Sequence, residues 1–79
     1  MLTDYIHSAM HRAEYDKLEN GTYCGEVAEL EGVWANAATL EDCRAELQSA
    51  VEDWIMFSLM NGFSILPLDG IVLAVSKVA

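Results

Sequence analysis

Positive charge is scarce in this sequence of 79 residues. Four lysines and arginines stand against 13 aspartates and glutamates, which leaves a formal net charge of −9. Nucleic-acid binding depends on Lys and Arg side chains that neutralise phosphates, and anionic membrane surfaces attract the same side chains. The composition therefore argues against both as partners, and it favours a basic protein, which the negative charge would attract.

Cysteine is also rare, and the N-terminus lacks the apolar run of a signal peptide. The two cysteines, Cys24 and Cys43, are too few for a disulfide framework. Disulfides belong to oxidising compartments and are uncommon in the cytosol. We therefore expect two reduced thiols in a cytoplasmic protein.

Long uninterrupted apolar runs are missing as well. Residues 54–73 are mostly apolar, but Asn61-Gly62, Pro67 and Asp69-Gly70 interrupt them. A membrane-spanning helix needs about 20 consecutive apolar residues. The sequence thus predicts a soluble protein, and its length predicts a single domain over residues 1–79.

No catalytic motif is present. There is no Gly-x-Ser-x-Gly, no His-Glu-x-x-His and no Gly-rich phosphate loop. The acids between Glu26 and Asp42 have ordinary roles on a strand, in a turn and at a helix start. His7 and His11 are spaced four apart, as zinc ligands on a helix can be, but they share a polar face with other solvated residues. We predict no catalytic residue, metal site or cofactor. A metal-dependent nuclease of ribonuclease-H-like type and a ligand-binding regulatory domain are the alternatives.

Apolar periodicity indicates the first elements. Residues 2–13 repeat apolar side chains with helical spacing. A hairpin follows over residues 14–28, with Asn20-Gly21 suited to a tight two-residue turn. That turn would place Leu18 opposite Tyr23, both on the core face. Gly25 on the same face predicts a close approach by another side chain, such as one from a helix.

The second half begins with a short strand over residues 33–38. Thr39 is then positioned to cap a long helix, and Gly62 is suited to end it. Residues 71–75 are β-branched and predict a last strand. The predicted order is α-β-β-β-α-β, an α+β fold with a small, mostly antiparallel sheet and helices packed on one face.

The end of the long helix is apolar on all sides. A surface of this kind is either buried in the core or covered by another chain, and a small domain favours the second. Large aromatic and methionine side chains are typical of interfaces. We therefore expect a homo-oligomer, a dimer or tetramer, whose interface involves the helix end, the last strand and a second tryptophan. The candidate residues are Trp34, Trp54, Met56, Phe57, Met60 and Val72.

Residues 20–54 resemble the HicB-like antitoxin family. The family pattern is a Gly-x-aromatic strand, an acidic strand end with Leu and Gly, a short strand, and a Thr-Leu-Glu-Glu-like helix start. The matching positions are Gly21, Tyr23, Val27, Glu29, Leu30, Gly32, Val33, Thr39, Leu40, Glu41 and Asp42. The resemblance implies a truncated ribonuclease-H-like fold without catalytic acids, in a short form without a DNA-binding domain. It also implies a small basic HicA-type toxin, an mRNA-cleaving enzyme, as partner, and it leaves open whether such a toxin exists here.

Overall fold

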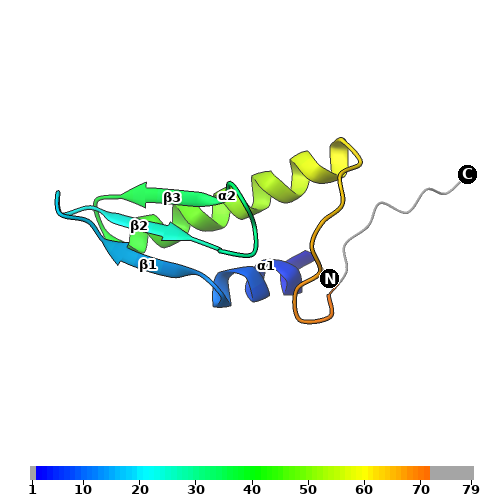
Figure 1. Ribbon diagram of the computed structural model, residues 1–79, viewed down its shortest axis with the longest axis horizontal. Helices are drawn as coiled ribbons and strands as arrows, with labels where there is room; N and C mark the ends of the chain where they lie inside the picture. Colours follow the sequence, from blue (N-terminus) through cyan, green and yellow to red (C-terminus); the bar gives the residue numbers. More distant parts are fainter. Residues whose placement is uncertain (1, 72–79) are drawn as a thin grey trace, which may run out of the picture.

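The computed structural model describes residues 2–71 and has the element order α1, β1, β2, β3, α2 (Figure 1). The elements are α1 (Leu2–His11), β1 (Glu14–Lys17), β2 (Tyr23–Glu26), β3 (Trp34–Ala37) and α2 (Leu40–Met60). This confirms the predicted α+β class and the order of the first five elements. The predicted last strand lies outside the described residues except for Ile71, which forms a single bridge with Leu68.

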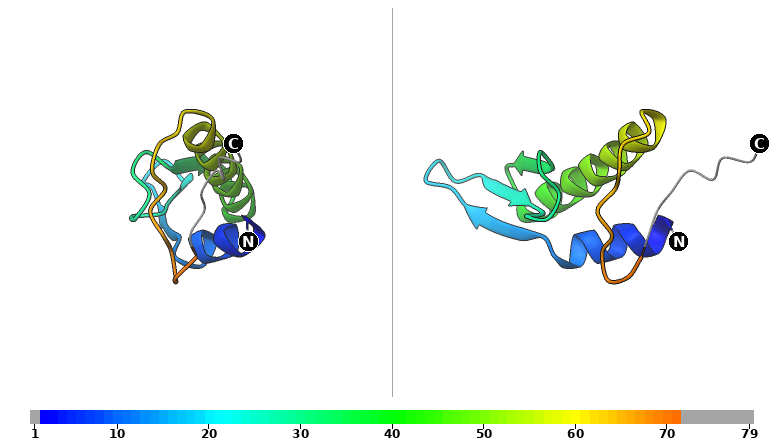
Figure 2. Two further views of the ribbon diagram at one scale, coloured as in Figure 1. Left: turned by 90° about the vertical axis from the view of Figure 1, so that its right-hand side faces the viewer. Right: turned by 45° about the vertical axis from the view of Figure 1, so that its right-hand side comes forward.

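The three strands form one antiparallel sheet in the order β1-β2-β3. Figure 2 shows both helices to one side of this sheet, as predicted. α2 packs across β2 and β3, and α1 lies against α2. Because α2 has 21 residues and each strand only four, the C-terminal part of α2 extends beyond the sheet (Figure 1).

The turn between β1 and β2 has three residues rather than the predicted two. The amide of Leu18 donates to the carbonyl of Thr22 at 2.7 Å, which encloses residues 19–21. Gly21 has a φ of 85°, whereas Asn20 keeps a negative φ. The Asn20 side chain instead accepts a hydrogen bond from the Thr22 amide at 3.0 Å. A turn closed by a left-handed glycine is the common three-residue hairpin loop, and Asn20 is satisfied within it.

The extra loop residue shifts the hairpin register by one position. Lys17, not Leu18, pairs with Tyr23, and Leu18 is exposed. A one-residue shift moves a side chain to the other face of a sheet. Tyr15 therefore lies on the core face of β1, directly opposite Gly25, whereas the sequence prediction had placed Leu18 on that face, opposite Tyr23. The predicted close approach at Gly25 is confirmed, and it comes from both Tyr15 and Cys43 of α2.

Both ends of α2 follow the sequence prediction. Thr39 Oγ1 accepts a hydrogen bond from the Asp42 amide at 3.1 Å, so Thr39 is the N-cap. At the other end Gly62 has a φ of 68°, and the amide of Phe63 donates to the Ser58 carbonyl at 2.8 Å. This is the hydrogen bond of a Schellman motif, which satisfies a carbonyl of the last turn.

Residues 62–71, the return segment, run back from α2 towards α1 (Figure 1). Ile65 and Leu68 of this segment are buried, and the Tyr5 hydroxyl donates to the Leu66 carbonyl. The core thus lies between the sheet, both helices, the β2–β3 loop and the return segment. Its buried apolar residues are Tyr5, Ala9, Met10, Val27, Leu30, Val33, Ala35, Cys43, Leu47, Val51, Ile55, Ile65 and Leu68.

Candidate functional site

The face of the sheet that is turned away from α2 carries polar and acidic side chains. Side chains alternate between the two faces of a strand, and directly paired residues share a face. We call the outward set the open sheet face. It consists of Glu14, Glu26 and Trp34 in one row and Asp16, Cys24 and Asn36 in the next.

Trp34 is 62% exposed on the open sheet face. Glu26 lies directly between Trp34 and Glu14. Like charges directly opposite each other in a sheet destabilise it, and within residues 2–71 neither glutamate has a cationic partner. The isolated chain therefore holds two repelling carboxylates beside an exposed indole.

The acids of residues 26–42 do not gather into one site. Within residues 2–71 no group of three or more His, Cys, Asp and Glu side chains is arranged to hold a metal ion. Both cysteines are free, and burial raises the pKa of the Cys43 thiol, which keeps it protonated and unreactive.

Glu29 has a structural role that the sequence did not reveal. Arg12, just after the end of α1, forms ion pairs with Glu29 of the β2–β3 loop, at 2.9 Å, and with Asp69 of the return segment. The hydrogen bond from Arg12 lowers the pKa of the Glu29 carboxyl. Hydrogen bonds from Ser8 and then from Arg12 lower the pKa of Asp69. One guanidinium thereby connects three segments that are far apart in the chain.

Three large apolar side chains at the C-terminal end of α2 are exposed. Met56 and Phe57 are each 59% exposed and Met60 is 78% exposed. The ring centroid of Phe63 lies 5.7 Å from that of Phe57. We call these four residues the apolar helix end. Trp54 is half-buried against the core, so it does not belong to this surface in full.

The six residues predicted for an interface are thus distributed over the molecule. Met56, Phe57 and Met60 lie together on α2. Trp34 lies on the open sheet face, on the other side of the sheet from α2. Val72 lies outside the described residues. The periodicity of a single helix brought the first three together, whereas the position of Trp34 depends on which face of the sheet α2 covers.

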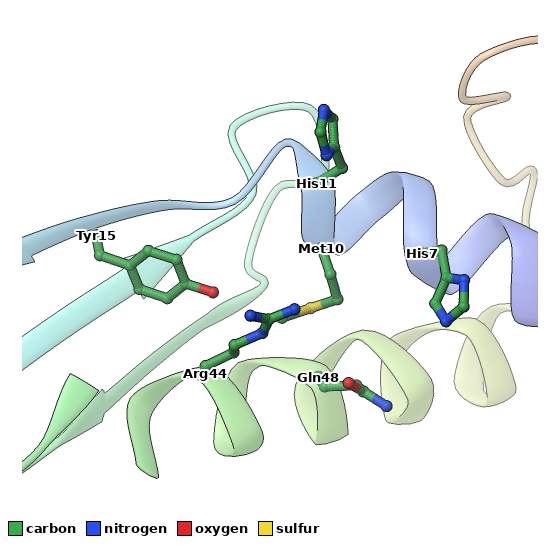
Figure 3. A pocket seen from close by; sticks show the side chains of 6 residues that line it. All are labelled: His7, Met10, His11, Tyr15, Arg44 and Gln48. Atoms are coloured by element: carbon green, nitrogen blue, oxygen red, sulfur yellow. The ribbon is translucent and has the colours of Figure 1, made fainter. Parts of the chain in front are cut away.

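A pocket between α1 and α2 was not anticipated from the sequence. It encloses about 360 Å³ and is lined by His7, Met10, His11, Tyr15, Arg44 and Gln48 (Figure 3). The two histidines that the sequence raised as a metal pair border it, together with an arginine. They also border a neighbouring hollow lined by Asp4 and Asp69. Helical spacing could have placed His7 and His11 together, but Tyr15 and Arg44 join them only through packing.

Two helices and a three-stranded antiparallel sheet make this a small α+β protein. No helix in the described part of the chain is both long and apolar enough to cross a bilayer. Residues 4–66 match the UPF0150-like family, and the chain belongs to that family, which is related to the HicB-like antitoxins.

The fold also matches a solved structure, that of TTHA0281 from Thermus thermophilus. The two proteins are 39% identical and superpose with a TM-score of 0.89. The match covers 96% of this chain and 95% of that one. No curated protein matches the sequence.

Proposed function

We propose that this chain is a non-catalytic, HicB-type interaction domain that binds a small basic protein and masks its working surface. The observation that carries the proposal is the open sheet face, where Glu14 and Glu26 repel each other beside an exposed Trp34. Membership of a family related to HicB-like antitoxins supports it.

The charges of the open sheet face suit a cationic partner. A lysine or arginine placed between Glu14 and Glu26 would replace repulsion by attraction, and the net charge of −9 would accelerate the encounter. Trp34 offers a large, rigid apolar surface at the edge of these acids, and tryptophan is enriched among the residues that dominate interface energies. The open sheet face therefore combines a large apolar contact residue, Trp34, with negative charge that is complementary to a basic partner.

The resemblance to HicB-like antitoxins points to a HicA-type mRNA-cleaving toxin as the basic partner. The chain would neutralise such an enzyme by occupying the cationic surface that the enzyme needs for RNA. Nothing in this mechanism requires a catalytic group on the antitoxin, because inhibition follows from occlusion.

The test is co-expression with the product of the neighbouring gene, followed by purification and measurement of the dissociation constant. We expect a complex that the double variant Glu14→Gln/Glu26→Gln weakens by at least about tenfold. The matched control is Glu31→Gln/Glu46→Gln, which removes the same charge from exposed positions outside the sheet face. Absence of any complex with a small basic protein, or equal losses in both double variants, would contradict the proposal.

We also propose that the chain self-associates through the apolar helix end. Two copies that each carry a charge of −9 repel each other, so a surface without charged side chains is the most favourable place for contact between them. Residues 54–60 contain no charged side chain, and three of them are largely exposed. A second copy placed on this surface would bury Met56, Phe57 and Met60 without bringing carboxylates together.

A further inference from the structure

The three lysine and arginine side chains within residues 2–71 differ in their interaction partners. Arg12 is paired with two carboxylates, and Lys17 lies 5.9 Å from the centre of the Tyr23 ring. Arg44 makes no hydrogen bond or ion pair within the described residues. The chain has 13 acidic residues, yet the exposed guanidinium of Arg44 forms an ion pair with none of those within residues 2–71.

Arg44 instead faces the pocket between α1 and α2 (Figure 3). The Tyr15 hydroxyl points towards it from β1, and Gln48 lies one turn further along α2. His7 approaches from α1, and the side chain of Met10 lies between the helices. None of the six lining residues is acidic, and five of them carry a hydrogen-bond donor.

We propose that this pocket binds a small oxyanion, a molecule that presents a phosphate or carboxylate group to Arg44. The planar guanidinium offers a pair of parallel N–H donors that fits both groups. Tyr15 and His7 would donate hydrogen bonds to the oxyanion from either side of Arg44. The thioether of Met10 would contact the apolar part of the molecule. The volume of about 360 Å³ falls in the range of small-molecule sites, and it exceeds what a bare ion fills.

The protonation state of Tyr15 supports this role. Burial raises the pKa of the Tyr15 hydroxyl, and the nearby Arg44 opposes that rise only in part. The hydroxyl therefore remains a neutral donor at physiological pH, as an anion site requires. This inference does not depend on the open sheet face, which lies on the other side of the sheet from α2.

The experiment titrates the full chain with sodium phosphate and, separately, with disodium succinate at constant ionic strength. Amide NMR signals of residues 7–15 and 44–48 report the binding. We expect saturable shifts with at least one probe. Saturation by phosphate alone identifies a phosphate-type ligand, and saturation by succinate alone identifies a carboxylate.

Three variants make the test specific. Arg44→Gln should weaken binding by at least about tenfold, because it removes the charge-assisted pair of donors. Tyr15→Phe keeps the ring and removes one donor, so a smaller loss of about threefold to tenfold is expected. Lys17→Gln removes an equal charge outside the pocket and should change the affinity by less than about twofold. The proposal is overturned if neither probe saturates, or if Lys17→Gln weakens binding as much as Arg44→Gln.

Discussion

Tyr15 lies directly opposite Gly25 across β1 and β2, and its ring occupies the space that a side chain on residue 25 would need. A Cβ on residue 25 would come within 2.8 Å of the Tyr15 ring and 3.1 Å of Cys43 Sγ. Real Cβ atoms do not approach other atoms as closely as the first distance. The absence of a side chain at Gly25 is therefore what lets the Tyr15 ring and α2 pack on the same spot of the sheet.

Replacing Gly25 with alanine should destabilise the fold. Overpacking of a filled core costs about 1–3 kcal/mol, and here neither a ring held in a strand pair nor a buried thiol can move away easily. Urea denaturation measures the change. In a Tyr15→Val background, where the ring is absent, the same substitution should cost less, and an equal cost in both backgrounds would refute the packing explanation.

The N-cap of α2 should contribute measurably to stability. Thr39→Ala removes the acceptor of the Asp42 amide and should lower the free energy of unfolding by about 1 kcal/mol. Thr39→Ser keeps the hydroxyl oxygen and should retain most of the stability. If serine costs as much as alanine, the side-chain hydrogen bond is not the cause.

The ion pairs of Arg12 should make stability depend on pH in the acid range. The pKa values of Glu29 and Asp69 are lowered in the folded chain from their ordinary values of 4.5 and 3.8. Their contribution is therefore present above those values, and it is lost as the pH falls through the lowered pKa of each folded carboxyl. Arg12→Gln should therefore be less stable than the wild type at pH 7. The difference in the free energy of unfolding between the two proteins should shrink near pH 3.

Denaturation of both proteins between pH 7 and pH 3 provides the measurement. Protonation also relieves the general repulsion among the acidic side chains, and this affects both proteins alike. The difference in the free energy of unfolding between wild type and Arg12→Gln therefore reports the ion pairs alone. Because the three side chains are partly exposed, 1 M salt should shrink the difference at pH 7. A difference that does not change with pH would contradict the assignment.

Glu26→Gln should stabilise the isolated chain and weaken its proposed complex. Removing one of two directly opposed carboxylates relieves a cross-strand repulsion of about 0.2–1 kcal/mol. The same change should slow association with a basic partner, since steering depends on charge. The matched control is Asp16→Asn, because Asp16 lies opposite the neutral Cys24. This substitution should raise the free energy of unfolding by less than Glu26→Gln does. Equal stabilisation by both substitutions would show that net charge alone is responsible.

Met60→Glu should abolish self-association if the apolar helix end is its surface. Sedimentation at micromolar concentration should then show a monomer for Met60→Glu and an oligomer for the wild type, because two added charges would meet at the contact. Leu40→Glu is the control, an equally drastic change at an exposed leucine at the start of the same helix. A monomeric wild type, or the same loss from Leu40→Glu, would contradict the proposal.

The local features could be predicted because each depends on a few neighbouring residues. The Thr39 cap, the end of α2 at Gly62 and the apolar character of the turns before it all follow from chemistry within a few residues. So does the need for a close contact at Gly25, since a glycine on the covered face of a strand leaves a space to be filled. These conclusions about α2 and the sheet required no knowledge of how the elements pack.

The tertiary structure decided what depends on residues far apart in the chain. The β1–β2 loop has one residue more than predicted, which shifts the register of the hairpin by one position. Because side chains alternate along a strand, Tyr15 and not Leu18 lies on the core face. The side of the sheet on which α2 packs left Trp34 exposed. Arg12 and Arg44 look alike in the sequence, and only packing paired the first with two carboxylates and left the second facing a pocket. Periodicity determines which face of an element is apolar, but the long-range contacts determine what each polar side chain meets.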